Sequence, residues 1–138
     1  MVTNKTPKVL FICDVKNWAW YYKSLELKRY LYDDFDIDIA CVLAGDKIDP
    51  KAYDIYFTFG HSYIDIEPLR SVPREKKITG ATAHRPSDIL KPKMDQAIAI
   101  HANSILLANE MINIHELVYY LPNGVNEDLF TYQSIPEK

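Results

Sequence analysis

Histidine and arginine side chains stand directly after two short apolar runs of this sequence. His84 and Arg85 follow the run Ile78–Ala83, and His101 follows the run Ala97–Ile100. An imidazole donates or accepts hydrogen bonds near neutral pH, and a guanidinium suits the planar recognition of phosphate oxygens. Each side chain also has an ordinary structural use, His84 in tying down the proline-containing loop and Arg85 in a surface salt bridge. The residue types indicate binding chemistry, and the fold must position them.

Short runs rich in strand-forming residues predict the β-strands. They are Lys8–Cys13, Ile37–Leu43, Ile55–Phe59, Ile78–Ala83, Ala97–Ile100 and Val118–Leu121. These runs are apolar on both faces and are separated by connections of helix length, which is typical of a parallel sheet with helices on both sides. We therefore expect one α/β, doubly wound domain with a mostly parallel sheet of about six strands.

The segment Trp18–Tyr32 has a helical pattern with two apolar stripes. One stripe contains Trp18, Tyr22 and Leu25, and the other contains Trp20, Leu27 and Leu31. Residues at this spacing share a face of a helix, and a buried face needs a packing partner. We therefore expect this first helix to be covered on two sides.

Three later segments have helical signals of different strength. The clearest begins near Ser104, with Asn103 as its expected cap and with a stripe of Ile105, Ala108 and Ile112. Pro68 suits the first turn of a short helix. Residues Arg85–Asp95 contain two prolines, so we expect an irregular loop or a short turn of helix.

Ligands of an open parallel sheet bind at the carboxyl ends of the strands, and this rule selects the candidate site. The segments at those ends are Asp14–Trp20, Gly60–Tyr63, His84 with Arg85, His101–Ser104 and Asn123–Asn126. We expect the residues that bind a ligand to come from these segments.

Composition and motifs argue against several classes of protein. The net charge of -3, with both signs interspersed, provides no broad basic face, so we expect no nucleic-acid partner. The loop Asp14–Trp18 has none of the glycines of a dinucleotide site, and no P-loop occurs. No apolar run has the length of a membrane span or of a signal peptide's core. We expect a cytoplasmic protein, with peripheral membrane contact left open.

We expect no metal and no resident cofactor. Asp34, Asp36 and Asp38 alternate, but Ile39 stands where a calcium loop needs glycine, so outward positions of a strand are the favoured interpretation. A metal site there is the lesser alternative. The four histidines form no close pair typical of zinc. Cys13 and Cys41 end strand-like runs, which favours buried, inert thiols over a redox or ligand role.

Three segments together resemble the N-terminal domain of family 4 glycosyltransferases, which have the GT-B fold. Asp14–Trp20 (DVKNWAW) is similar to the opening D-x-x-G-W-A-F of one branch. Ile98–Ser104 (IAIHANS) is similar to a strand-to-helix step written S-A-N-S. Tyr120–Phe130 (YLPNGVNEDLF) looks like the passage I-P-N-G-V-D-x-x-x-F that leads toward the second domain. The resemblance covers nearly the whole chain and is carried by the order of the three segments.

This resemblance implies one half of a GT-B fold. Residues 1–130 would be the Rossmann-like, acceptor-side domain, and residues 131–138 would be a linker or a disordered tail. The nucleotide-sugar donor would be bound by a C-terminal domain or a partner subunit, and the sugar would pass to a glycan, lipid or small-molecule acceptor. The isolated chain is then expected to be inactive. A non-catalytic binding or assembly module, or a subunit of a split transferase, is the alternative.

The same resemblance assigns roles to individual residues. His84 matches the family histidine that approaches the donor sugar, which implies a catalytic role. Asn123 and Gly124 would form the interdomain hinge, with Gly124 supplying backbone freedom. Asn17 stands where the branch often has glycine, and Arg85 where many relatives have aspartate. The expected acceptor-binding residues are Lys16, Asn17, Trp18, Trp20, His61, Arg85, His101 and Asn103.

Overall fold

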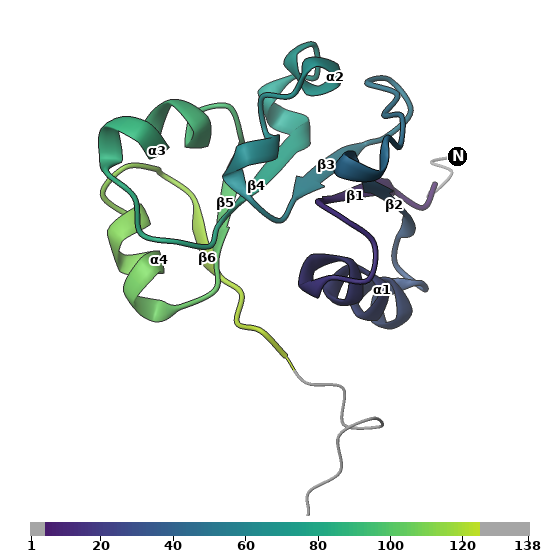
Figure 1. Cartoon of the computed structure of the whole chain (residues 1–138), viewed down its shortest axis with the longest axis horizontal. Coiled ribbons are helices and arrows are strands. Elements are labelled where there is room, and N and C mark those ends of the chain that lie inside the picture. The colour runs from purple at the N-terminus through teal and green to yellow at the C-terminus, as the bar shows by residue number, and fades with distance from the viewer. Residues whose placement is uncertain (1–4, 125–138) are drawn as a thin grey trace, which may run out of the picture.

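The computed structural model describes residues 5–124 and contains one parallel sheet in the order β2-β1-β3-β4-β5-β6 (Figure 1). Its strands are β1 Lys8–Cys13, β2 Asp36–Cys41, β3 Ile55–Thr58, β4 Lys77–Ala81, β5 Ala99–Ala102 and β6 Val118–Tyr120. The prediction of a doubly wound, Rossmann-like α/β domain is confirmed. The expected linker or tail, residues 131–138, lies outside the described residues.

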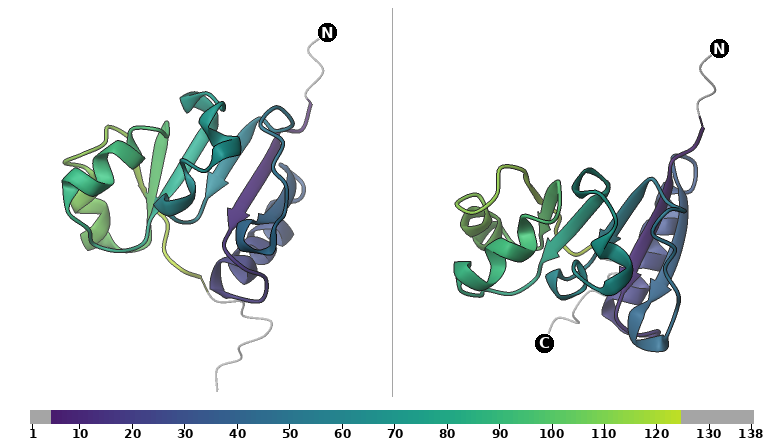
Figure 2. Two further views of the ribbon diagram at one scale, coloured as in Figure 1. Left: turned by 45° about the horizontal axis from the view of Figure 1, so that its top comes forward. Right: turned by 90° about the horizontal axis from the view of Figure 1, so that it is seen from above.

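The helices divide between the two faces of the sheet (Figures 1 and 2). They are α1 Ala19–Leu31, α2 Glu67–Arg70, α3 Ser87–Met94 and α4 Ile105–Met111, with short 3-10 turns at Val42–Ala44, His61–Tyr63 and Arg74–Lys76. The connection from β1 to β2 runs in the opposite direction along the sheet from the connections that lead from β3 to β6. Because crossovers are right-handed, α1 lies on one face and α2, α3 and α4 lie on the other.

Alternating side chains of β1 join two different cores. Leu10 and Ile12 pack with Tyr56 and Leu69 on the α2 side. The other residues of the strand, Val9, Phe11 and Cys13, pack beneath α1 with Phe59 and half-buried residues of that helix. On the α2 side the core continues past β4 to α3 and α4, where Leu90, Met94, Ile100 and Leu107 are buried. Both faces of the sheet are therefore apolar, as the runs in the sequence predicted.

The helix α3 is longer than the irregular loop or short turn of helix expected at Arg85–Asp95. Residues Ser87–Met94 form eight residues of helix although Pro92 lies inside it. Pro92 removes one hydrogen bond to the preceding turn, at a cost of roughly 3 kcal/mol. Leu90 and Met94 are completely buried, and burial of each contributes about 1.5 to 3 kcal/mol. Tertiary packing therefore offsets the cost of the proline. The short helix α2 has Pro68 in its first turn, as predicted.

The helix α4 begins one residue later than expected. Its cap is Ser104 and not Asn103, because Oγ of Ser104 accepts a hydrogen bond from the Leu107 amide at 3.1 Å. The buried face also differs from the predicted stripe, because packing against β5 and α3 decides which residues of the helix face the core. Leu107, Ala108 and Met111 are buried, whereas Ile105 and Ile112 are exposed.

The two cysteines lie side by side. Cys13 and Cys41 end the adjacent strands β1 and β2 in register, and their Sγ atoms are 3.4 Å apart. Both are free and buried, and burial raises the pKa of Cys13 to about 12. The expected burial of these thiols is confirmed.

The acidic residues of β2 point outward. Asp36 and Asp38 are exposed on either side of buried Ile37, as the period of a strand predicts. Across residues 5–124, no cluster of three or more histidine, cysteine or acidic side chains has an arrangement that suits a metal ion. In the same part of the chain, no helix combines the length and the apolar character needed to cross a membrane.

Candidate functional site

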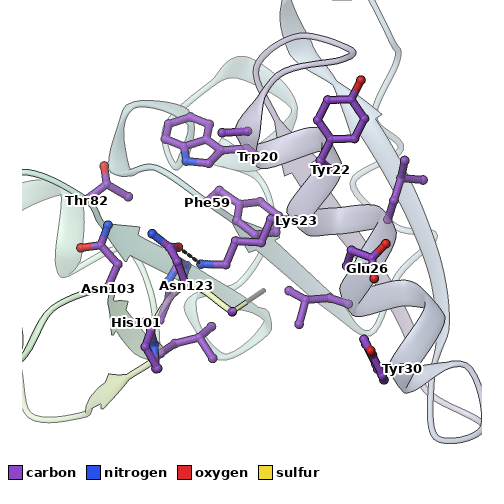
Figure 3. Close-up of a pocket in the computed structure, with 16 residues that line it drawn as sticks. Trp20, Tyr22, Lys23, Glu26, Tyr30, Phe59, Thr82, His101, Asn103 and Asn123 are labelled. Carbon is purple, nitrogen blue, oxygen red and sulfur yellow. Dashed lines mark hydrogen bonds between the residues drawn. The ribbon is translucent and has the colours of Figure 1, made fainter. Parts of the chain in front are cut away.

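A cavity of about 840 Å³ lies between α1 and the carboxyl ends of the central strands (Figure 3). Phe59 follows β3, Thr82 follows β4 and Asn103 follows β5, so the cavity is at the edge of the sheet where ligands are expected. Small-molecule sites usually have volumes of roughly 300 to 1,000 Å³. The cavity therefore has the position and the size of a ligand site.

In the part of the chain that the structure describes, the helix α1 is covered on one side only, so the expectation that it is covered on two sides is wrong. The stripe of Trp20, Leu27 and Leu31 packs against the core beneath the helix. Tyr22 and Leu25, from the other stripe, are 53% and 40% exposed and line the cavity. The physical reason is the topology, since the described helices other than α1 cover the opposite face. We call the face of the sheet that α1 covers the α1 face. Its open part, over β4, β5 and β6, is covered by no helix of the described residues.

His101 lies deep in the cavity and is held by β3. Its ring stacks on Phe57 with centroids 4.5 Å apart, and Nε2 donates a hydrogen bond to the carbonyl oxygen of Thr58 at 3.0 Å. Burial lowers the pKa of His101 to about 4, and the charge of Lys23 acts in the same direction against the opposing effect of the Thr58 carbonyl. The imidazole is therefore neutral at pH 7, and Nδ1 keeps a lone pair for accepting a hydrogen bond.

The position of His101 depends on a glycine in the neighbouring strand. Strand register places Gly80 directly beside His101. A Cβ at Gly80 would overlap the carbonyl oxygen of Phe59 and the imidazole of His101. Only glycine leaves enough space for this close approach of backbone and ring.

Lys23 crosses the cavity from α1 toward the segment that follows β6. Its Nζ donates a hydrogen bond to Oδ1 of Asn123 at 2.9 Å and lies 5.9 Å from the centre of the Phe59 ring. Figure 3 shows this hydrogen bond spanning the space between the helix and Asn123. Burial lowers the pKa of Lys23. The chain after β6 is thereby joined to α1, toward which it runs in both views of Figure 2.

Trp20 forms one end of the cavity and is fixed by packing. Its ring meets Tyr63 edge to face, with centroids 6.1 Å apart and an interplanar angle of 88°. Gly60 lies against the same indole, and a Cβ there would overlap the ring. Trp20 therefore presents a rigid aromatic surface to the cavity.

The loop before α1 does not line the cavity. Lys16, Asn17 and Trp18 are exposed, and Trp18 is the N-cap residue of the helix. Asn17 has a φ of 64°, in the left-handed region that glycine adopts most readily and asparagine tolerates. Asparagine can therefore occupy this position, although glycine would adopt the conformation more readily.

The other polar candidates also lie outside the lining. His84 is exposed, and its Nδ1 lies 2.6 Å from Oε2 of Glu110 on α4. His61 is half-buried after β3; burial lowers its pKa, and the charges of Lys93 and Arg85 lower it further. The structure therefore separates His84, Arg85 and His61 from the cavity between α1 and β5.

Of the predicted site residues, the cavity brings five together. They are Trp20, His101, Asn103, Asn123 and Gly124. Gly124 has open space around it and no positive φ, so the backbone freedom expected of it is not used in this structure. The lining residues that sequence reasoning missed include Tyr22, Lys23, Glu26, Tyr30, Phe59, Thr82 and Leu121. The α1 stripe of Trp18, Tyr22 and Leu25 was the signal for Tyr22, because an apolar stripe without a packing partner indicates a binding surface.

No protein-family model matches this chain, and no curated protein matches it significantly. The resemblance to glycosyltransferases therefore rests on the three segments of the sequence itself. The functional interpretation therefore depends on the residues that line the cavity.

Proposed function

We propose that this chain is the acceptor-binding half of a glycosyltransferase that moves a sugar from a nucleotide sugar to a glycan, lipid or small molecule. The acceptor would lie in the cavity between α1 and the strand ends. The donor would be bound by a second Rossmann-like domain or by a partner subunit, in the cytoplasm. The observation that carries this proposal is the aromatic cavity at the carboxyl edge of the parallel sheet.

The lining suits a molecule with both apolar surface and hydroxyl groups. The rings of Trp20, Tyr22 and Tyr30 provide flat apolar surfaces along α1. Opposite them, Asn103 offers an amide that donates and accepts, and neutral His101 offers an acceptor nitrogen. Specific sites combine a mostly apolar lining with a few such polar groups, which fix the orientation of the ligand.

In this proposal the chain contributes positioning, and the reacting groups meet at the edge that would face the donor half. His84 is exposed after β4 and is oriented by Glu110, so we keep it as the proposed catalytic histidine on the donor side. Preorganised hydrogen bonds of this kind stabilise charge that develops in the transition state. No nucleophile on this half is required by the proposal.

The test is to offer the purified chain alkyl glycosides and a panel of nucleotide sugars. We expect saturable binding of a glycoside, reported by tryptophan fluorescence, and no sugar transfer. Trp20→Phe should weaken the binding and abolish most of the fluorescence change. Trp18→Phe is the matched control, because Trp18 is exposed and lies outside the cavity lining. Sugar transfer by the chain alone, or unchanged binding in Trp20→Phe, would contradict the proposal.

A subunit of a split transferase, or a non-catalytic assembly module, is the second candidate. The observation that favours it is an apolar surface on α4, where Ile105, Leu106 and Ile112 are each more than 60% exposed. Leu106→Glu would then abolish association with a partner and leave glycoside binding intact. Loss of glycoside binding in that variant would count against a separate docking surface.

A further inference from the structure

The ammonium group of Lys23 is held inside an apolar cavity by a neutral partner. Its side chain passes from α1 across the ring of Phe59 and ends 2.9 Å from Oδ1 of Asn123 (Figure 3). An ammonium has three N–H donors, and an amide oxygen satisfies one of them without supplying any charge. Within residues 5–124 the other two donors of Lys23 have no hydrogen-bond partner, so they can bind a ligand.

No carboxylate within residues 5–124 neutralises Lys23. Glu26 also lines the cavity, but the described residues contain no ion pair between it and Lys23; its Oε2 lies 3.3 Å from Nη2 of Arg29 and makes no hydrogen bond. His101 is neutral at pH 7, so it adds no charge of either sign beside Lys23. Lys23 is half-buried, and this burial lowers its pKa, as expected for an ammonium that is partly removed from water without a counter-charge. An anion entering the cavity would supply the missing partner.

The surfaces around this cation are apolar. Tyr22 and Leu25 line the cavity from α1, and Leu121 and Pro122 line it from the segment after β6. A small inorganic anion would contact Lys23 and leave these surfaces exposed to water. A molecule with an anionic group attached to an apolar body would contact Lys23 and also cover the apolar surfaces.

We infer that the cavity binds an anionic amphiphile, with a phosphate or carboxylate head on Nζ of Lys23 and an apolar body along α1. This inference names the class of acceptor for the proposed function and rests on it only in placing the acceptor in this cavity. The head group and the apolar body are both required for tight binding.

Calorimetric titration of the full chain with four matched probes tests the inference. The probes are decyl phosphate, decanol, inorganic phosphate and decyltrimethylammonium, used below their micelle-forming concentrations. A hydrogen bond to a charged group predicts that decyl phosphate binds roughly 10-fold to 100-fold more tightly than decanol. Inorganic phosphate and the cationic probe should bind more weakly still.

Variants of α1 assign this preference to one residue. Lys23→Met keeps the apolar stem and should make decyl phosphate and decanol bind with similar affinity, whereas Lys23→Arg should preserve the preference. Lys28→Met is the matched control, since Lys28 is an exposed lysine of the same helix outside the cavity lining. Melting temperatures of all variants confirm that they are folded.

Several results would overturn the inference. These are equal binding of decanol and decyl phosphate by the unmodified chain, retention of the preference in Lys23→Met, and binding of inorganic phosphate as tight as that of decyl phosphate. Glu127 and Asp128 lie in sequence just after Asn123, outside the described residues. If decyl phosphate bound only after the double change Glu127→Gln and Asp128→Asn, the chain's own carboxylates would be the partner of Lys23.

Failure of this inference can be distinguished from failure of the proposed function. If neutral glycosides bind and a phosphate head adds no affinity, the inference fails and the glycosyltransferase proposal stands. If decyl phosphate binds through Lys23 and the purified chain transfers sugar by itself, the inference stands and the proposed function fails.

Discussion

The two faces of this sheet have been filled in different ways. On one face, α3 and α4 cover β4 and β5, and Leu90, Met94 and Leu107 fill the space between the helices and the strands. On the other face, α1 covers β1 and β2, and the region toward β6 holds His101 at the base of a cavity. The same strands supply both faces, so the difference comes from the direction of the crossovers. The closed face provides stability, and the open part of the α1 face is available for binding.

The largest predicted effect is the loss of stability when a residue of the closed face is truncated, compared with a residue of the open part of the α1 face. Leu90→Ala should lower the free energy of unfolding by about 2 to 5 kcal/mol, because Leu90 is completely buried. Tyr22→Ala, at an exposed residue that lines the cavity, should change it by about 0.5 kcal/mol or less. Urea denaturation of both variants checks the contrast. Equal losses would mean that the open part of the α1 face is also a packed core.

The next effect is a dependence of stability on pH that arises from His101. Its pKa is about 4 in the folded chain, against an ordinary value of 6.5, so the unfolded chain binds the proton more readily in this range. The stability is fully present above pH 6.5 and is lost as the pH falls toward 4, by on the order of 3 kcal/mol. Unfolding measured at intervals of pH should show this slope.

His101→Gln is the control for the titration. It removes the ionisable group and should flatten the difference in stability between pH 6.5 and pH 4 relative to the unmodified chain. A slope that persists in His101→Gln would assign the effect to another group. The imidazole would then not be held in its neutral form by the base of the cavity.

A substitution at Gly80 tests how tightly His101 is packed at the base of the cavity. Gly80→Ala should destabilise the fold by roughly 1 to 3 kcal/mol, since the added Cβ would overlap Phe59 and the ring of His101. Gly124→Ala has open space and is the matched control, with an expected change within about 0.5 kcal/mol. Thermal unfolding measures both. A Gly80→Ala variant as stable as Gly124→Ala would show that His101 is packed loosely.

At His84 a smaller effect on stability is expected than at Leu90, His101 or Gly80. Its pair with Glu110 is exposed, so His84→Ala should change the free energy of unfolding by no more than about 1 kcal/mol. If a donor half completes the enzyme, the same change should lower turnover on the order of 10²-fold, through the loss of a hydrogen bond used in the transition state. Measuring melting temperature and turnover on one preparation separates the two roles. Normal turnover of the folded fraction would remove His84 from the site.

The strands were predictable because a buried parallel strand needs apolar residues on both faces. The run Lys8–Cys13 matches β1, and the other runs agree with their strands to within a few residues. The partnership of Cys13 with Cys41 was not predictable, since it depends on the order of the strands in the sheet. The N-cap of α4 was misplaced by one residue because Asn103 and Ser104 both suit that position and only the backbone decides between them.

The candidate site was harder to predict than the fold. The rule about strand ends led to His101 and Asn103, which line the cavity. The same rule led to His84, whose side chain is paired with α4 instead. Lys23 was missed because a lysine in the middle of a helix resembles an ordinary solvent-exposed residue until the fold shows what lies opposite. Sequence position indicates which edge of a sheet a residue occupies, and tertiary packing decides where the side chain points.

A two-dimensional amide NMR titration with an alkyl glycoside or decyl phosphate measures directly whether the open part of the α1 face binds a ligand. We expect saturable shifts that cluster on α1 from Trp20 to Tyr30, at His101 and Asn103, and at Leu121, Asn123 and Gly124. The amides of α3 and α4 should not move. Shifts confined to α3, α4 or the loop at His84, or no saturable shift with either ligand, would show that the open part of the α1 face does not bind the ligand.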